Sequence, residues 1–191
     1  MPEELSDVVP ASGTLVVADL EYTTWEGALE GGWSEPGQFR EVVQIGAVRL
    51  DAGNRYAVLA DFSVLVRPTI NPELSDYFTG LTGITNAAVA RDGMALAAAL
   101  DNFAAFVGKD VVVSHGHDDL VIADECAFKE MANPLAGSDW RDVNPAIRKI
   151  TGRRMPNSAL PAHFGLAAPE SAHDALADAR SLARVLAHLQ Q

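Results

Sequence analysis

The chain has few of the features that mark secreted or membrane-bound proteins. Its 191 residues include a single cysteine, Cys126, which excludes an internal disulfide and is most simply a small buried hydrophobe. No apolar run approaches the roughly 20 residues that span a bilayer. The opening MPEELSDVVPASG lacks the basic flank and long apolar segment of a secretory signal. We therefore expect no membrane association and a cytoplasmic location.

Positive charge is also scarce. The chain has 14 Lys and Arg against 26 Asp and Glu, a formal net charge of −12. Because broad capture of nucleic acid normally uses a basic surface, this balance argues against it. It does not exclude an enzyme that acts on nucleic acid, since acids gathered at one site could be neutralised by divalent cations.

The length favours one domain, which we expect over residues 14–191 after a flexible segment at residues 1–13. The β-branched runs of the first part predict strands at 14–21, 41–50 and 56–68. Helical periodicity then predicts helices from Pro72 and over 93–108. The rest of the chain predicts a strand from Val111, a helix at 119–131, a weak strand at 139–143, a short helix from Asn144, a helical turn near residues 157–166 and a final helix at 173–190. The joint at residues 51–54 suggests a hairpin. A β-meander followed by alternating segments indicates an α/β fold with a mixed sheet flanked by helices.

Two carboxylates end the first predicted strand. Asp19 and Glu21 follow the apolar run at residues 15–17. Because residues i and i+2 of a strand lie on the same face, both acids point the same way and repel each other. Such a pair needs compensation, and cations beside the two carboxylates would provide it.

A third acid interrupts the apolar stripe of the last helix. Asp178 lies four, seven and eight residues before Leu182, Val185 and Leu186, so its carboxylate should be near the core. An ionised acid there is costly unless it is paired, hydrogen-bonded or bound to metal. Ser171 or Asp174 could cap this helix, and a well-capped helix with an incidental His173 is the alternative interpretation.

The segment VVVSHGHDDL again ends a hydrophobic strand in acids, Asp118 and Asp119, either of which could simply cap the following helix. Three separate segments thus bring acids to strand ends or to a core-facing stripe. Carboxylate oxygens are hard ligands that suit Mg²⁺ or Mn²⁺, and the pattern does not suggest structural zinc. The coincidence favours a divalent metal site.

These residues together resemble the exonuclease family whose active site combines Asp, Glu, Asp, Asp and His on a ribonuclease H-like fold. Asp19 and Glu21 in DLEYTTWE match its first motif, and HDALAD supplies His173 and Asp178 at the spacing of its third. SHGHDD is similar to the Ser-x-Gly-x-x-Asp form of the branch with histone-mRNA and small-RNA 3′ exonucleases, which favours Asp119 over Asp118. EVVQIGAV and LTGIT resemble intervening segments of that branch. The resemblance implies a five-stranded sheet, an antiparallel meander followed by parallel strands.

The same resemblance implies a mechanism. Asp19, Glu21, Asp119 and Asp178 would hold two Mg²⁺ ions, with Mn²⁺ as a substitute, and His173 would help to deprotonate the attacking water. The expected substrates are 3′ ends of single-stranded RNA or DNA, and the expected products are nucleoside 5′-monophosphates. Two alternatives stay open: a catalytically silent nucleic-acid-binding or scaffold protein on this fold, and a phosphodiesterase of small nucleotides.

Weaker candidates surround the first motif. Leu20, Tyr22, Thr23 and Trp25 could contact the terminal nucleotide, since aromatic rings stack on unpaired bases. For Trp33 we favour packing of the loop onto the body. Arg153 and Arg154 form a basic pair that is more often solvated surface than a phosphate contact.

Overall fold

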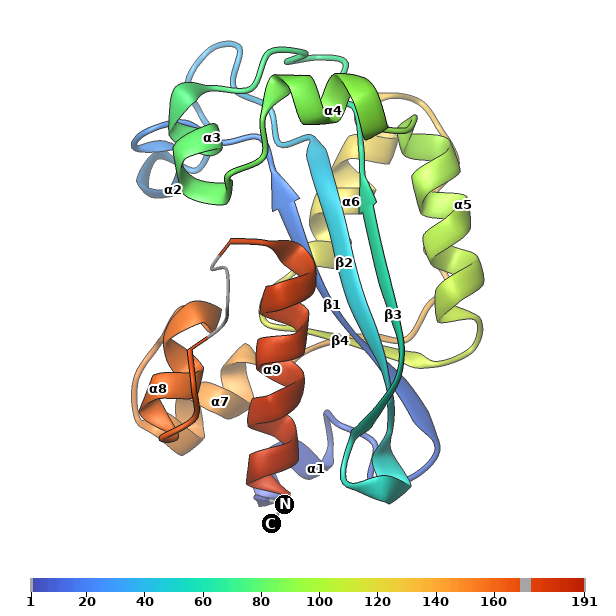
Figure 1. Ribbon diagram of the computed structural model, residues 1–191, viewed down its shortest axis with the longest axis vertical. Coiled ribbons are helices and arrows are strands. Elements are labelled where there is room, and N and C mark those ends of the chain that lie inside the picture. The colour runs from blue at the N-terminus through green and yellow to red at the C-terminus, as the bar shows by residue number, and fades with distance from the viewer. Residues whose placement is uncertain (1, 169–172, 191) are drawn as a thin grey trace.

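The structure, a computed structural model, describes residues 2–168 and 173–190 and contains a mixed five-stranded sheet in the order β3-β2-β1-β4-β5 (Figure 1). The strands are β1 (Thr14–Tyr22), β2 (Val42–Asp51), β3 (Ala57–Leu65), β4 (Val111–Ser114) and β5 (Trp140–Asp142). The first three form an antiparallel meander, and β4 and β5 run parallel to β1. The predicted α/β fold with a mixed sheet is confirmed.

Helices connect and cover these strands. They are α1 (Glu3–Ser6), α2 (Ala28–Gly31), α3 (Asp76–Thr82), α4 (Asn86–Asp92), α5 (Leu96–Val107), α6 (Asp118–Phe128), α7 (Asn144–Thr151), α8 (Leu160–His163) and α9 (Ala175–Leu189), with single 3₁₀ turns η1 (Ala52–Asn54) and η2 (Asn157–Ala159). Within the described ranges no helix is long and apolar enough to cross a membrane.

Alternation along β1 divides the core into two layers. Leu15 and Val17 pack with α7 and α9 on one face of the sheet. Val16, Ala18 and Leu20 pack with α5 and α6 on the other face. Figure 1 shows α9 on one side of the sheet and α5 and α6 on the other. Both faces of β1 are therefore buried, which explains its continuous apolar run.

Several predicted boundaries shift for identifiable reasons. The helix expected from Pro72 begins at Asp76, because the Ser75 hydroxyl accepts a hydrogen bond from the Phe78 N–H (3.0 Å) and caps it there. The last helix begins at Ala175 with Asp174 as its N-cap. The alternative cap, Ser171, lies outside the described residues.

Residues 2–13, part of the segment expected to be flexible, pack against the domain. Leu5 and Val9 are fully buried in the layer beneath α7 and α9. The Tyr56 hydroxyl donates a hydrogen bond to the Pro10 carbonyl (2.9 Å). The packed part of the chain thus begins before Thr14.

Candidate active site

The carboxyl end of β1 places two acids on one face of the sheet. Asp19 and Glu21 continue the Leu15 and Val17 side of the strand, the side that α9 covers. Both line a pocket of about 280 Å³ between β1, α3, η2 and the start of α9. Beyond Val17 the apolar face of β1 therefore becomes an acidic pocket wall.

Strand β2 fixes the start of α9 beside these acids. The Gln44 side chain, opposite Glu21, accepts a hydrogen bond from the Ala175 N–H (3.0 Å) and donates one to the Asp174 carboxylate (3.0 Å). Gly46 lies opposite Asp19, and a Cβ there would be 2.1 Å from the Leu176 backbone nitrogen. The absent side chain lets the first turn of α9 rest directly on the sheet.

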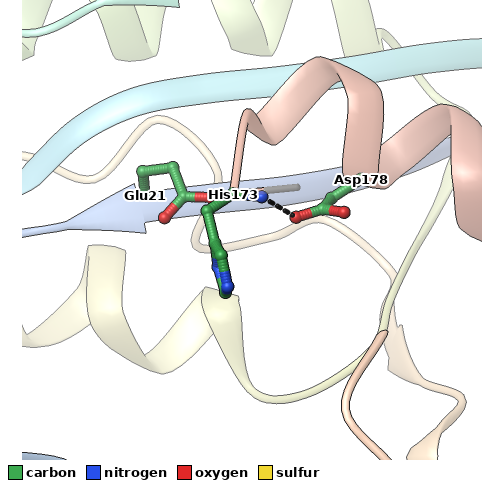
Figure 2. Close-up of side chains that lie close together, drawn as sticks. All are labelled: Glu21, His173 and Asp178. Carbon is green, nitrogen blue, oxygen red and sulfur yellow. Dashed lines mark hydrogen bonds between the residues drawn. The ribbon is translucent and has the colours of Figure 1, made fainter. Parts of the chain in front are cut away.

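That docking brings His173 and Asp178 to the pocket. Asp178 is buried on the core stripe of α9, and its Oδ2 accepts a hydrogen bond from the His173 N–H (3.0 Å). His173 has φ 60°, a left-handed conformation that histidine adopts more readily than most residues. Glu21, His173 and Asp178 each offer one ligand atom, and these three atoms lie within 4.8 Å of one another. Figure 2 shows the three residues side by side, with the hydrogen bond from the His173 main-chain nitrogen to Asp178.

The fourth acid of the pocket is Asp118, whereas the sequence motif favours Asp119. Asp118 lines the pocket wall; Asp119 does not, and its side chain is 39% exposed. Helical phase explains the difference: Asp118 lies three, four, seven and eight residues before the buried positions of α6, Val121, Ile122, Glu125 and Cys126. This phase is readable from the sequence, and it favours Asp118 as the pocket acid, whereas the Ser-x-Gly-x-x-Asp motif favours Asp119.

Burial is the main reason that the pKa values of all four acids are raised, and neighbouring carboxylates add to the effect. Burial, followed by the charges of Asp118, Glu21 and Asp178, raises the pKa of Asp19 well above its usual value. Burial and the neighbouring Asp178 and Asp118 raise that of Glu21 to about 8. Burial is also the main cause for Asp118, whose pKa rises to about 7, and for Asp178. The charges that add to burial at Asp118 are Asp119 and Asp142.

This donor set fits divalent cations. The described pocket lining contains no Lys or Arg that could neutralise the four acids. Oδ1 of Asp178 is buried and has no hydrogen-bond partner among the residues that the structure describes. Buried carboxylates without basic partners are stable as anions when they coordinate metal, and clustered oxygens suit Mg²⁺ or Mn²⁺.

The rest of the wall mixes apolar and polar side chains and differs in part from prediction. Leu20 and Tyr22 line the pocket, as expected. Thr23 does not: it is buried, and its hydroxyl donates to the Phe39 carbonyl and accepts from the Glu41 N–H. Trp25 is also absent from the described lining. The wall includes further residues that the sequence analysis did not single out for it: Thr24, Leu29, Trp33, Tyr77, Leu81, His115, Pro156, Asn157 and Ser158.

Trp33 takes the place expected for Trp25. Its ring lies 5.6 Å from that of Tyr22, and its Nε1 donates a hydrogen bond to the Thr23 carbonyl (3.1 Å). The loop therefore folds back so that the later tryptophan reaches the pocket, and the expectation that Trp33 only packs the loop onto the body is incomplete. No periodic pattern in the sequence distinguishes the two tryptophans.

Comparisons with known proteins find exonucleases similar in sequence and in fold. The RNase_T family model, described as exonuclease, matches residues 16–186. The 3′-5′ exonuclease Snipper of Drosophila melanogaster is 28% identical over 198 residues, which cover 90% of this chain and 67% of that protein. The nuclease domain of 3′hExo, a DEDDh family member bound to rAMP, superposes with a TM-score of 0.77 at 21% identity, covering 93% of this chain and 92% of that one. A 3′-exonuclease that recognises the histone mRNA stem-loop gives 0.80 at 20% identity, over 98% and 68%. The resemblance read from the motifs is confirmed.

Proposed function

The chain belongs to the RNase_T exonuclease family, and we propose that it is a divalent-cation-dependent 3′-5′ exonuclease of single-stranded RNA or DNA. The observation that carries the proposal is the meeting of four carboxylates and one histidine from three parts of the chain in a single pocket. Asp19 and Glu21 come from β1, Asp118 from α6, Asp178 from the first turn of α9, and His173 from the residues just before that helix.

Each acid has a place in the proposed site. Asp19, Glu21, Asp118 and Asp178 would hold two Mg²⁺ ions, with Mn²⁺ as a substitute. When bound, such ions neutralise charge on the scissile phosphate and make water more acidic. Asp118 replaces Asp119 in this set because it faces the pocket.

The remaining groups would act on substrate and water. His173 would accept a proton as water attacks the terminal phosphodiester, because it is the pocket side chain best suited to act as a general base beside the four acids. The new bond joins the water oxygen to phosphorus, and the bond to the 3′ oxygen of the preceding nucleotide breaks. Tyr22 and Trp33 offer aromatic faces on which the terminal base can stack. The product is a nucleoside 5′-monophosphate.

Digestion of matched RNA and DNA oligonucleotides tests this proposal. With Mg²⁺ or Mn²⁺ we expect shortening from the 3′ end and release of 5′-monophosphates, and with chelator no cleavage. A bulky group on the 3′ end should block the reaction. Efficient cutting of a circular strand would indicate an endonuclease instead.

The folded Asp19→Asn variant separates the enzyme from its main alternative, a silent binding protein on this fold. Asp19→Asn should abolish cleavage without destabilising the metal-free protein, because it removes repulsion between buried acids. Undiminished turnover by this variant would refute the site. If the wild-type protein binds oligonucleotides but never cleaves them under any metal condition, the silent binding protein is the better description.

A further inference from the structure

A second cavity opens from the same pocket. It has a volume of about 1390 Å³ and shares Tyr22, His115, Asp118 and Asn157 with the acidic pocket. This exceeds the upper end, about 1,000 Å³, of ordinary small-molecule sites. We call it the α7 groove, because residues 144–157, which include α7 and the turn after it, provide much of its wall. A groove of this size that continues an active site suits an extended ligand.

Positively charged side chains are concentrated in the α7 groove, although the chain as a whole is acidic. Four of the 14 Lys and Arg residues line it: Arg40, Arg148, Lys149 and Arg154. Arg40 pairs with Asp124 (2.9 Å). The other three are exposed, and none forms an ion pair within residues 2–168 and 173–190. Three cations thus face a cavity that leads to an acidic catalytic pocket.

Local structure accounts for only part of this arrangement. Arg148 and Lys149 lie in the last turn of α7, where positive charge interacts favourably with the helix dipole. Arg154 lies beyond the Gly152 cap, outside the reach of that effect. The neighbouring Arg153 is equally exposed but does not line the groove. Helix stabilisation therefore does not explain why Arg154 lines the groove.

We propose that Arg148, Lys149 and Arg154 bind the phosphates that precede the terminal nucleotide of a single strand. This inference rests on the proposed exonuclease function and narrows its substrate: the preferred substrate is an oligonucleotide that reaches along the α7 groove, and a dinucleotide or smaller phosphodiester leaves the groove empty. Phosphate charge complements the three cations, and the two cavities share wall residues.

The salt dependence of binding tests the groove without requiring turnover. Each phosphate contact to a single strand contributes about −0.7 to the slope of log affinity against log salt, so three contacts contribute about −2. Between 50 and 200 mM salt, wild-type affinity for a 12-nucleotide strand should fall roughly 20-fold more than that of the triple variant Arg148→Ala, Lys149→Ala, Arg154→Ala. The measurement uses a labelled strand with chelator present, so that the strand stays intact.

Arg153→Ala is the matched control, because it removes the same charge at the adjacent exposed position. It should leave the slope unchanged, whereas Arg154→Ala should reduce its magnitude by about 0.7. Equal effects of Arg153→Ala and Arg154→Ala would overturn the proposal, since the two charges would then act only through the general field. An unchanged slope in the folded triple variant would overturn it as well.

Turnover on two substrate lengths distinguishes a failure of the groove proposal from a failure of the proposed exonuclease function. In the triple variant, kcat/KM for the 12-nucleotide strand should fall roughly 10-fold or more at 50 mM salt, and the loss on a dinucleotide should be much smaller. Equal losses on both would refute the groove while leaving the exonuclease intact. If the wild-type protein cleaves neither substrate, the proposed function fails, and the salt slope alone decides whether the groove binds a strand.

Discussion

Replacing Gly46 with alanine should disable the pocket without changing any residue in it. Gly46 lies on β2 opposite Asp19, and the first turn of α9 rests on it. An added Cβ would lie 2.1 Å from the Leu176 nitrogen and 2.2 Å from the Ala175 carbonyl carbon. Both neighbours are backbone atoms, so no side-chain rotation can relieve the overlap. Either α9 or β2 must move.

The required movement sets the magnitude. Ordinary contact begins at 3.4 Å, so the Leu176 nitrogen is 1.3 Å too close. Asp178 is on this helix and His173 directly precedes it, so a shift of α9 displaces both from Glu21. A misplacement of about 1 Å can cost roughly 100-fold in rate. Forcing an extra methyl group into a packed core costs about 1 to 3 kcal/mol of folding free energy.

The assay is steady-state cleavage of a 3′-labelled strand at a temperature where the variant is folded by circular dichroism. We expect kcat to fall roughly 100-fold with a much smaller change in KM, because the catalytic groups move while the groove stays in place. Gly137→Ala is the control: a Cβ there has no neighbour within 4 Å, and both activity and stability should be retained. A Gly46→Ala protein with wild-type kcat and thermal stability would refute the reasoning.

Three further predictions follow from individual side chains. Asp118→Asn should lower kcat/KM by roughly 100-fold or more and Asp119→Asn by far less. The reverse order would show that Asp119 is the metal ligand, as the Ser-x-Gly-x-x-Asp motif predicts. His173→Ala should lose roughly 100-fold or more in kcat while binding the oligonucleotide normally, and unchanged kcat would exclude it as the proton acceptor. Burial alone would raise the pKa of Glu41, but backbone N–H bonds from residues 69–71 and the Lys129 ammonium hold it below 4.5. Because the folded-state pKa is lowered, the Glu41 carboxylate stabilises the fold at neutral pH, and this stabilisation is lost as the pH falls through the folded-state pKa. Glu41→Gln should therefore cost about 2 kcal/mol of folding free energy at neutral pH and progressively less below pH 4.5. Denaturant titrations that show the same difference at every pH would contradict this.

The parts of the site that lie on regular elements were predictable from periodicity. Alternation along β1 puts Asp19 and Glu21 on one face, and the stripe of α9 puts Asp178 toward the core. Asp118 was equally accessible, because its helical phase matches the buried face of α6. The short motif and the phase of the helix that follows it favour different aspartates, and the two variants above decide between them.

The pocket walls could not be predicted in the same way. The loop between β1 and β2 has no repeating pattern, so nothing in its sequence shows that Trp33 folds back beside Tyr22. Tyr77 reaches the wall from α3, more than fifty residues after β1. The role of Gly46 depends on how closely α9 approaches β2, a property of tertiary packing that no local pattern contains.

Net charge is a poor guide to whether this chain can bind a polyanion. Charges separated by more than about 8 Å are largely screened at physiological ionic strength, so a strand in the α7 groove responds mainly to the groups that line it. Those groups include four cations and two acids, Asp118 and Asp142, so the groove lining carries an excess of positive charge while the overall charge is −12. At about 10 mM ionic strength the screening length grows to about 30 Å, and acids across the molecule begin to repel the strand. As the salt concentration falls below 50 mM, the affinity for the strand should therefore rise less steeply than the phosphate contacts in the groove alone would predict. An acidic surface combined with a short basic groove would favour a single strand that enters the active site over nucleic acid lying elsewhere on the protein.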